Sequence, residues 1–364
     1  MTRSIDDIMK NVSEKMSKRN PAENKEANEA PCLCQGRYYF IKRKENGERF
    51  FEVCPHCNPR LTCKICDSTG NLIQKNKVTG ATEAIPNGCE CVVWEARTRK
   101  LNAANIPEKY LLAEFSFDNI QYGKKHLSPN LAEKFEENQA QIRDFCEHAD
   151  NVILEGVNPG DKYTLGLVGP VGSGKTYLGV CALKDLIWHY GHNGKFIDFQ
   201  ALLHKIRDSY TKNLSEDEIM EPLRRVDVLM IDEFGKGRAE KEWENEKLDD
   251  LVNSRYNNGR VTILTTNYVP KHLSINQIHS RQNADRGAGK TSSQTWFLGE
   301  ENGSKTSSAD GYQVITLSER IGERMYDRIQ ETTVWVDFTG ISSFRKKMAE
   351  DFLVRMNETQ DPQK

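Results

Sequence analysis

A glycine-rich stretch followed by a lysine and a threonine is the clearest group of residues able to do chemistry. LGLVGPVGSGKTYL, residues 165–178, fits the pattern G-x-x-x-x-G-K-[ST]. Gly172 and Gly174 let the backbone curl, so that successive N–H groups point inward at phosphate oxygens. Lys175 would reach the β- and γ-phosphates, and the Thr176 hydroxyl would hold Mg²⁺. The pattern predicts a site for ATP and Mg²⁺ formed by Gly169, Pro170, Val171, Gly172, Ser173, Gly174, Lys175, Thr176 and Tyr177.

Two acids at the end of an apolar run form a second candidate group. RVDVLMIDE, residues 225–233, predicts a buried strand that ends in Asp232 and Glu233. Downstream of a phosphate loop this is the Walker B pattern. Asp232 would hold Mg²⁺, directly or through water, and Glu233 would orient and deprotonate the attacking water. The next apolar run ends at Asn267, which we expect beside these acids. The pair favours ATP hydrolysis over binding alone.

The cysteines indicate a metal. Eight of the ten lie between Cys32 and Cys91 in four close pairs, and disulfides are rare in a reducing compartment. Four thiolates suit tetrahedral, structural Zn²⁺ and leave no open position for catalysis. We predict two zinc ions, held by Cys32, Cys34, Cys54 and Cys57 and by Cys63, Cys66, Cys89 and Cys91. An interleaved arrangement, with the outer pairs on one ion and the inner pairs on the other, also fits, and His56 could replace a neighbour.

The segments between the cysteine pairs predict β-hairpins. Residues 37–53 are aromatic and β-rich, with Asn46-Gly47 at the turn, and residues 68–88 form a more polar candidate. In the first hairpin basic residues alternate with aromatic ones: Arg37, Lys42, Arg43, Lys44 and Arg49 with Tyr38, Tyr39, Phe40, Phe50 and Phe51. Two interpretations stay open, a nucleic-acid surface and a charged solvent face on a small metal-stabilised fold.

The remaining chain alternates helical patterns with apolar strands. Helices are expected over residues 92–100, 130–148, 201–210, 240–256 and 317–330, and strands over 195–199, 225–233, 260–266 and 334–338, besides the strand before the phosphate loop. This alternation predicts a parallel α/β sheet with helices on both faces. Cys146 and Cys181 fall in helical patterns, and we expect both to be buried packing residues.

Composition sets the broad class. With 364 residues, 37% apolar and 29% charged, the chain has room for one full-size domain plus extensions. A net charge of −2 restricts any nucleic-acid contact to local patches. No apolar run approaches the length of about 18 residues that a membrane span needs, and MTRSIDDIMK lacks a signal-peptide core. We therefore expect a cytoplasmic protein that has no membrane contact.

The two ends of the chain and one internal stretch are polar. Residues 4–18 carry an apolar stripe at helical spacing, formed by Ile5, Ile8, Met9, Val12 and Met16. This helix would dock in a partner's groove or fold back on its own chain. We expect a flexible insertion over 274–311. The predicted organisation is a flexible N-terminus (1–31), a double zinc-ribbon-like module (32–95), a helical linker (96–150), an ATPase core (151–355) and a tail (356–364).

The motifs together resemble the AAA+ branch that holds the DnaC/DnaI replicative helicase loaders and the IstB-type transposition ATPases. The resemblance rests on NIPEKYLLAEFSFDNI, GPVGSGKT, VLMIDEFG, ILTTNY, ERMYDRI, VWVDF and GISSFR, within residues 100–270 and 314–355. It implies an AAA+ P-loop core behind a Cys-rich domain. It further implies that Asn267 takes the sensor I position, with Thr266 as the alternative. Arg328 resembles the arginine finger, with Arg324 as the alternative, and Arg345 resembles sensor II.

The function that the resemblance implies is an ATP-dependent homo-oligomer that assembles on single-stranded DNA and loads a replicative helicase. The N-terminal stripe resembles the helicase-docking helix of the DnaC type. An IstB-like regulator of a transposase on duplex DNA is one alternative. A zinc-dependent nucleic-acid-binding adaptor with structural ATP is another. The insertion at 274–311 and the first set of four cysteines depart from the pattern of the relatives.

Overall fold

The computed structural model describes residues 34, 37–75, 82–87, 89–115, 127–212, 215–236, 242–271, 273, 316–341 and 343–344. The N-terminal stripe, Cys32, the predicted insertion and Arg345 lie outside these residues. The chain divides into two compact units, Met1–Leu112 with Lys184–Gly194, and Ala113–Leu183 with Lys195–Lys364.

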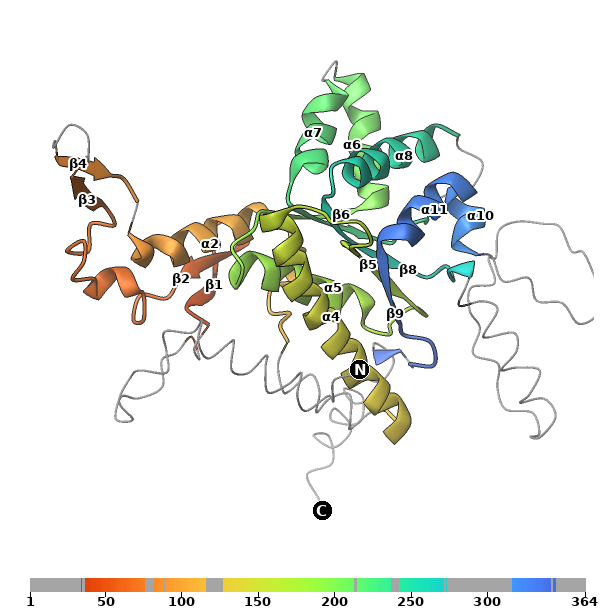
Figure 1. The fold of residues 1–364 in the computed structure, drawn as a ribbon, viewed down its shortest axis with the longest axis horizontal. Helices are drawn as coiled ribbons and strands as arrows, with labels where there is room; N and C mark the ends of the chain where they lie inside the picture. The colour runs from red at the N-terminus through yellow and green to blue at the C-terminus, as the bar shows by residue number, and fades with distance from the viewer. Residues whose placement is uncertain are drawn as a thin grey trace, which may run out of the picture. The chain divides into compact units, whose positions relative to one another are not determined.

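The described residues of the first unit form two hairpins, the helix α2 and the end of the helix α5 (Figure 1). Strands β1 (Tyr39–Arg43) and β2 (Arg49–Val53) pair antiparallel, and Gly47 at their turn has a φ of 87°. Strands β3 (Leu72–Lys75) and β4 (Thr82–Ile85) form the second hairpin. The short 3-10 turn η2 (Pro59–Thr62) lies between the two hairpins in the chain, and the turns η3 (Glu90–Val92) and η4 (Glu108–Tyr110) flank α2 (Val93–Ala103). Both predicted hairpins are confirmed.

Aromatic residues of the first hairpin form the core of this unit. Tyr38, Tyr39 and Phe51 are each at most 7% exposed. Tyr38 stacks on Trp94 of α2 with ring centroids 4.7 Å apart, and Tyr39 meets Phe51 edge-on at 5.3 Å. Bases cannot stack on these three buried rings, whereas Phe40 and Phe50 are partly exposed. Most of the hairpin's aromatic residues thus belong to the core, which favours the interpretation as a charged solvent face.

Three of the five basic residues of the first hairpin also have acidic partners. Lys44 pairs with Glu48 at 3.0 Å, and Lys42 pairs with Glu52 across the hairpin. Arg49 Nε lies 3.0 Å from an oxygen of Glu108. Neutralised cations attract phosphates less strongly, so this arrangement further weakens the nucleic-acid interpretation.

The second unit is built on a five-stranded sheet with the order β6-β7-β8-β5-β9. The strands are β5 (Thr164–Val168), β6 (Gly194–Asp198), β7 (Val228–Asp232), β8 (Val261–Thr266) and β9 (Thr333–Asp337). The pairs β7–β8, β8–β5 and β5–β9 are parallel. Every residue of β5, β7 and β8 is buried, as expected for central strands of a parallel sheet. The predicted parallel α/β sheet is confirmed.

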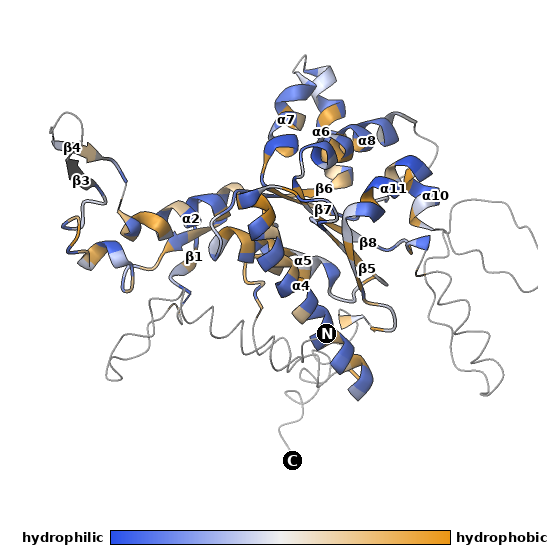
Figure 2. Cartoon of the chain, viewed as in Figure 1, coloured by the Kyte–Doolittle hydropathy of each residue, from blue (hydrophilic) through white to orange (hydrophobic). Residues whose placement is uncertain are grey.

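Helices cover this sheet. The helices are α4 (Pro129–Glu155), α5 (Lys175–Trp188), α6 (Phe199–Thr211), α7 (Glu216–Arg225), α8 (Glu242–Asn257), α10 (Leu317–Ile321) and α11 (Glu323–Thr332). One continuous apolar cluster joins α6, α7, α8, α10 and α11 to β7 and β8. In Figure 2 the helix α4 carries both polar and apolar residues along its length, as amphipathic helices do. Among the described residues, no helix combines the length and apolar character needed to cross a bilayer.

Two local predictions need correction. The single helix expected over residues 317–330 is broken into α10 and α11 by Gly322, whose φ of 84° lies outside the helical region. Helix α7 was not predicted. Ser215 at its N-cap and the acids of its first turn are start signals, but Pro222 inside the helix obscures the pattern. Cys146 and Cys181 are 0% and 2% exposed, which confirms that both are buried.

Candidate functional site

The phosphate loop connects β5 to α5 and depends on glycine for its shape. Gly172 and Gly174 have φ values of 81° and 95°, in the region that side chains disfavour. A Cβ atom added at Gly172 would lie 2.1 Å from Ser343 Oγ. The carbonyl of Gly172 accepts a hydrogen bond from the Phe344 N–H at 3.0 Å. The loop is therefore packed against the C-terminal residues, and glycine is required at position 172.

Lys175 begins α5 and folds back over the loop. It is only 7% exposed, and its Nζ donates to the carbonyls of Gly169 and Pro170 at 2.8 and 2.7 Å. The ammonium group is thus held inside the curl of the loop, where the helix N-terminus adds positive potential. A buried cation at a helix N-terminus is suited to an anionic phosphate group.

The phosphate loop and the acids of β7 are brought together. Thr176 Oγ1 donates to Asp232 Oδ1 at 2.9 Å. Burial raises the pKa of Asp232, as do the charges of Glu233 and Asp198, whereas hydrogen bonds from Thr265 and Thr176 lower it. A buried carboxylate beside a threonine hydroxyl and other acids offers the oxygen ligands that Mg²⁺ prefers.

Glu233 follows the strand in a left-handed conformation, with a φ of 57°. Its carboxylate is partly exposed and lies 2.5 Å from the Nζ of Lys236. Its backbone N–H donates to Thr265 Oγ1 at 3.0 Å. Strained backbone of this kind is concentrated at functional sites.

Strand β8 lies between β5 and β7, so its C-terminal end reaches the two acids. Asn267 follows directly after this strand and is half-buried. Thr266 does not face the acids, because its hydroxyl donates to the Phe234 carbonyl at 2.9 Å. The residue that does contact them is Thr265, whose hydroxyl donates to Asp232 Oδ1 at 2.5 Å. The sequence prediction missed Thr265 because it considered only residues at the tip of the apolar run.

The predicted arginine finger is not an open surface residue. Arg328 on α11 is partly buried and forms an ion pair with Asp249 of α8. Arg324, one turn earlier, is exposed. Neither arginine belongs to the cluster around Asp232.

The second set of cysteines forms a compact four-sulfur cluster. The Sγ atoms of Cys63, Cys66, Cys89 and Cys91 lie within 4.8 Å of one another, and three of these residues are buried. The pairs Cys63–Cys89 and Cys66–Cys91 are 3.6 and 3.5 Å apart. Tetrahedral zinc with sulfur ligands spaces its sulfurs by roughly 3.7 Å. The donor set therefore fits structural zinc.

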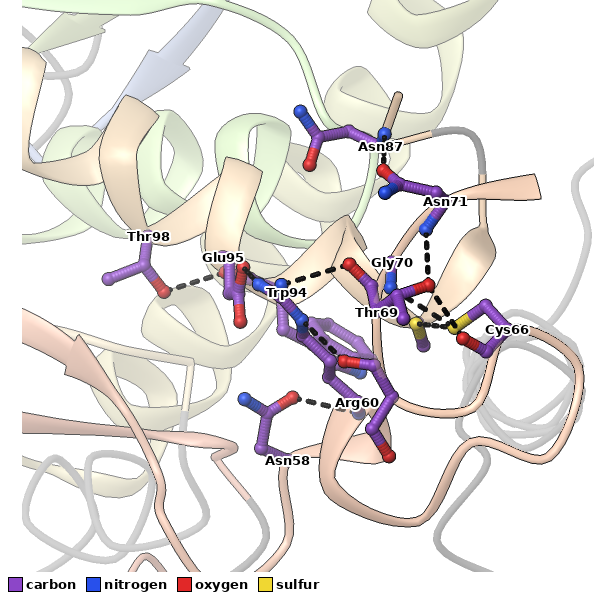
Figure 3. Close-up of polar contacts among 12 residues, drawn as sticks. Asn58, Arg60, Cys66, Thr69, Gly70, Asn71, Asn87, Trp94, Glu95 and Thr98 are labelled. Carbon is purple, nitrogen blue, oxygen red and sulfur yellow. Dashed lines mark hydrogen bonds and ion pairs between the residues drawn. The ribbon is translucent and has the colours of Figure 1, made fainter. Parts of the chain in front are cut away.

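A network of hydrogen bonds fixes the loop around this cluster (Figure 3). The Gly70 N–H donates to Cys66 Sγ at 3.2 Å, and a Cβ at Gly70 would lie 2.6 Å from Val92. Arg60 Nη1 donates to Glu95 at 2.7 Å, and its Nη2 donates to the Thr69 carbonyl at 3.0 Å. Arg60 thereby ties the cysteine loop to α2.

The first set of cysteines also converges. Cys34, Cys54 and Cys57 have their Sγ atoms within 4.8 Å of one another, and Cys32 lies outside the described residues. Burial raises the pKa of the Cys57 thiol, and the neighbouring thiols raise it further. The cysteines group by neighbouring pairs along the chain, so the interleaved arrangement is wrong. His56 is exposed and belongs to neither cluster.

Comparison with known proteins finds a family model that matches just under half of the chain. Residues 95–274 match the model of the IstB-like ATP binding protein family. No curated protein matches the chain.

Several solved structures are similar to this chain. A crystal structure of the DnaC helicase loader is 22% identical, with a TM-score of 0.41, and the match covers 64% of this chain and 99% of that one. A crystal structure of DnaI is 17% identical, with a TM-score of 0.38, covering 64% and 94%. AMPPCP-bound DnaA from Aquifex aeolicus is 16% identical, with a TM-score of 0.34, covering 58% and 50%. At these scores the fold assignment rests on the strand order and loop geometry of the chain itself.

Proposed function

We propose that the protein is a Mg²⁺-dependent ATPase that loads a replicative helicase onto single-stranded DNA. The proposal starts from the match of residues 95–274 to the IstB-like ATP binding protein family. The observation that supports hydrolysis is the position of Glu233. It follows directly after Asp232, which is hydrogen-bonded to Thr176 at 2.9 Å. A carboxylate placed beside the metal-binding group can accept a proton from water.

Each residue of the site has one task in this proposal. Lys175 exchanges the carbonyls of Gly169 and Pro170 for phosphate oxygens, at little cost because both sets of partners are acceptors. Thr176 and Asp232 hold Mg²⁺, which neutralises charge on the transferred phosphoryl group when it is bound. Glu233 accepts the proton of the attacking water. Asn267, at the tip of β8, orients that water.

The reaction would be completed by a neighbouring subunit. Arg328, or Arg324 one turn earlier, would reach the γ-phosphate of the next subunit, and Arg345 would contact it from within the same chain. ATP would thereby bridge two copies and make assembly nucleotide-dependent. Hydrolysis would release this contact and shift the assembly between two states.

The partner is proposed from the N-terminal sequence. The stripe Ile5, Ile8, Met9, Val12 and Met16 would dock in a groove of the helicase. A second candidate, a regulator of a transposase on duplex DNA, is favoured by the name of the matching family. The two differ in partner and not in nucleotide chemistry.

The ATPase proposal is tested with Glu233→Gln, with Lys175→Ala as its control. We expect Glu233→Gln to bind ATP and form stable assemblies but to lower kcat about 100-fold or more. Lys175→Ala should weaken ATP binding itself by about 100-fold, because two charge-assisted hydrogen bonds are lost. Wild-type protein that binds ATP without turnover, with and without single-stranded DNA, would favour the adaptor function instead.

The partner proposal is tested by affinity capture from the native host with the full chain as bait. Ile8→Asp places a charge in the apolar stripe, whereas Lys10→Asp places one on the polar side of the same helix. Capture of a replicative helicase by wild type and Lys10→Asp, but not by Ile8→Asp, supports the loader. Capture of a transposase supports the second candidate.

The cysteine clusters are proposed to hold two structural zinc ions. Cys63, Cys66, Cys89 and Cys91 supply four thiolates to one ion. Cys34, Cys54 and Cys57 supply three to the other, and Cys32 is the proposed fourth ligand. With four sulfur ligands each ion would stabilise its fold and take no part in ATP hydrolysis.

A further inference from the structure

One buried hydroxyl contacts both acids of the Walker B pair. Thr265 is 2% exposed and is the penultimate residue of β8. Its Oγ1 lies 2.5 Å from Asp232 Oδ1 and 3.0 Å from the backbone nitrogen of Glu233. Thr265 is thus joined to the metal-binding acid through its side chain and to the catalytic acid through its backbone.

The chemistry of the three groups fixes the direction of both hydrogen bonds. A backbone N–H can only donate, so the Thr265 oxygen must accept from Glu233. The single hydroxyl proton is then free for Asp232, whose carboxylate oxygen can only accept when ionised. A separation of 2.5 Å is typical of a hydroxyl donating to a charged oxygen. The hydroxyl therefore has both partners that it needs.

Thr265 also holds the backbone on both sides of the strained residue. Its carbonyl accepts from the Phe234 N–H at 2.8 Å, while its hydroxyl accepts from the Glu233 N–H. The left-handed conformation of Glu233, with a φ of 57°, is one that side chains disfavour. Hydrogen bonds to two successive N–H groups stabilise that conformation and fix the direction in which Glu233 leaves the strand.

Thr176 cannot replace Thr265 in this position. Both hydroxyls donate to Asp232 Oδ1, Thr176 at 2.9 Å and Thr265 at 2.5 Å. Under the proposed function the Thr176 hydroxyl would be a ligand of Mg²⁺ and so would not be available to orient Asp232. The Thr265 hydroxyl would stay hydrogen-bonded to Asp232, because Thr265 belongs to a buried strand and not to the phosphate loop.

We propose that Thr265 is a positioning residue for ATP hydrolysis: its hydroxyl orients Asp232 toward Mg²⁺ and holds Glu233 in the conformation that faces the attacking water. This inference rests on the proposed ATPase function. It assigns to β8 a role in the reaction that is separate from that of Asn267 at the strand tip.

The test compares Thr265→Val, which keeps the shape and removes the hydroxyl, with Thr265→Ser, which keeps the hydroxyl. We expect Thr265→Val to lower kcat about 10- to 100-fold, as the loss of one positioning hydrogen bond does in other active sites. The Mg²⁺ concentration for half-maximal activity should rise, whereas ATP binding measured without Mg²⁺ should stay within about 3-fold of wild type. Thr265→Ser should restore kcat to within about 3-fold of wild type.

A matched control is Thr262→Val on the same strand. The Thr262 hydroxyl contacts Arg255 at 3.0 Å and neither acid. This variant should lower the melting temperature but keep kcat when it is assayed below that temperature. It therefore reports the effect of losing a buried hydroxyl from β8 without disturbing the site.

Two results would overturn the inference: Thr265→Val with the kcat and Mg²⁺ dependence of wild type, or Thr265→Ser impaired as strongly as Thr265→Val. The second result would show that packing of the methyl group matters and the hydroxyl does not. Failure of the ATPase proposal would be seen separately, as wild-type protein without turnover. In that case the comparison of Mg²⁺-dependent with Mg²⁺-independent nucleotide binding still tests Thr265.

Discussion

Arg328 on α11 and Asp249 on α8 form an ion pair, with Nη1 3.5 Å from Oδ1. The Arg328 side chain is 22% exposed and contributes to the wall of a small cavity with Arg255 and Tyr256. An arginine finger must leave such a pair to reach the γ-phosphate of a neighbour. Arg324 is exposed, and it forms no ion pair with any residue that the structure describes. The two arginines therefore make different predictions.

If Arg328 is the finger, Arg328→Ala should lower kcat of the assembled protein about 1,000-fold while ATP binding persists. Asp249→Asn is the matched control, because it removes the same ion pair and leaves the arginine in place. We expect its kcat to stay near that of wild type. Equal losses in both variants would assign a structural role to the pair, and Arg324→Ala would then be the variant that loses turnover.

Gly172→Ala tests the packing of the phosphate loop. A Cβ there would meet Ser343 Oγ at 2.1 Å, in addition to the strain of a φ of 81°. Gly160 has a similar φ of 90° but no atom within 4 Å of an added Cβ, so Gly160→Ala isolates the strain. We expect Gly160→Ala to lose about 1–2 kcal/mol with normal ATP binding. Gly172→Ala should lose more stability than Gly160→Ala and should bind ATP poorly. Equal stability and equal ATP binding of the two variants would show that the contact with Ser343 does not matter.

Asp232→Asn should stabilise the nucleotide-free protein at neutral pH. The pKa of Asp232 is raised by burial and by Glu233 and Asp198, so its ionised form is less favourable in the folded chain than in the unfolded one. That penalty is absent below the unfolded pKa and grows as the pH rises through the folded pKa. We therefore expect the variant to have a higher Tm than wild type at pH 7.5.

The control for this prediction is the same measurement at lower pH. The difference in Tm between Asp232→Asn and wild type should shrink as the pH falls, because protonation of the wild-type carboxyl removes the penalty. The variant should also lose Mg²⁺-dependent ATP binding. A difference in Tm that grows at low pH would contradict a raised pKa for Asp232.

Zinc content tests the two cysteine clusters. Wild type should hold two zinc ions per chain by elemental analysis, and Cys146→Ala, which changes a buried cysteine outside both clusters, should hold the same number. Cys57→Ala combined with Cys66→Ala should remove both ions, because the two residues belong to different clusters. An interleaved arrangement would place them on one ion, and the double variant would then keep one.

Much of the nucleotide site follows from the sequence because its parts are local. The residues from Gly169 to Thr176 are consecutive, and the glycines alone allow the backbone curl that places Lys175 and Thr176. The turn at Asn46-Gly47 is equally local, since Gly47 supplies the positive φ that the hairpin needs. In each case the residues that interact lie within one short segment.

Only the tertiary structure decided which distant residues meet. The cysteine spacing is compatible with two groupings. In the structure each hairpin brings the cysteine pairs at its two ends together, which gives the grouping by neighbouring pairs. Tyr38 is a candidate for stacking on nucleic-acid bases in the sequence, but in the structure it packs against Trp94 and is part of the core. Thr265 became part of the site because the sheet inserts β8 between β5 and β7. That order results from packing over the whole sheet, so no local pattern around Thr265 could have revealed its contact with Asp232 and Glu233.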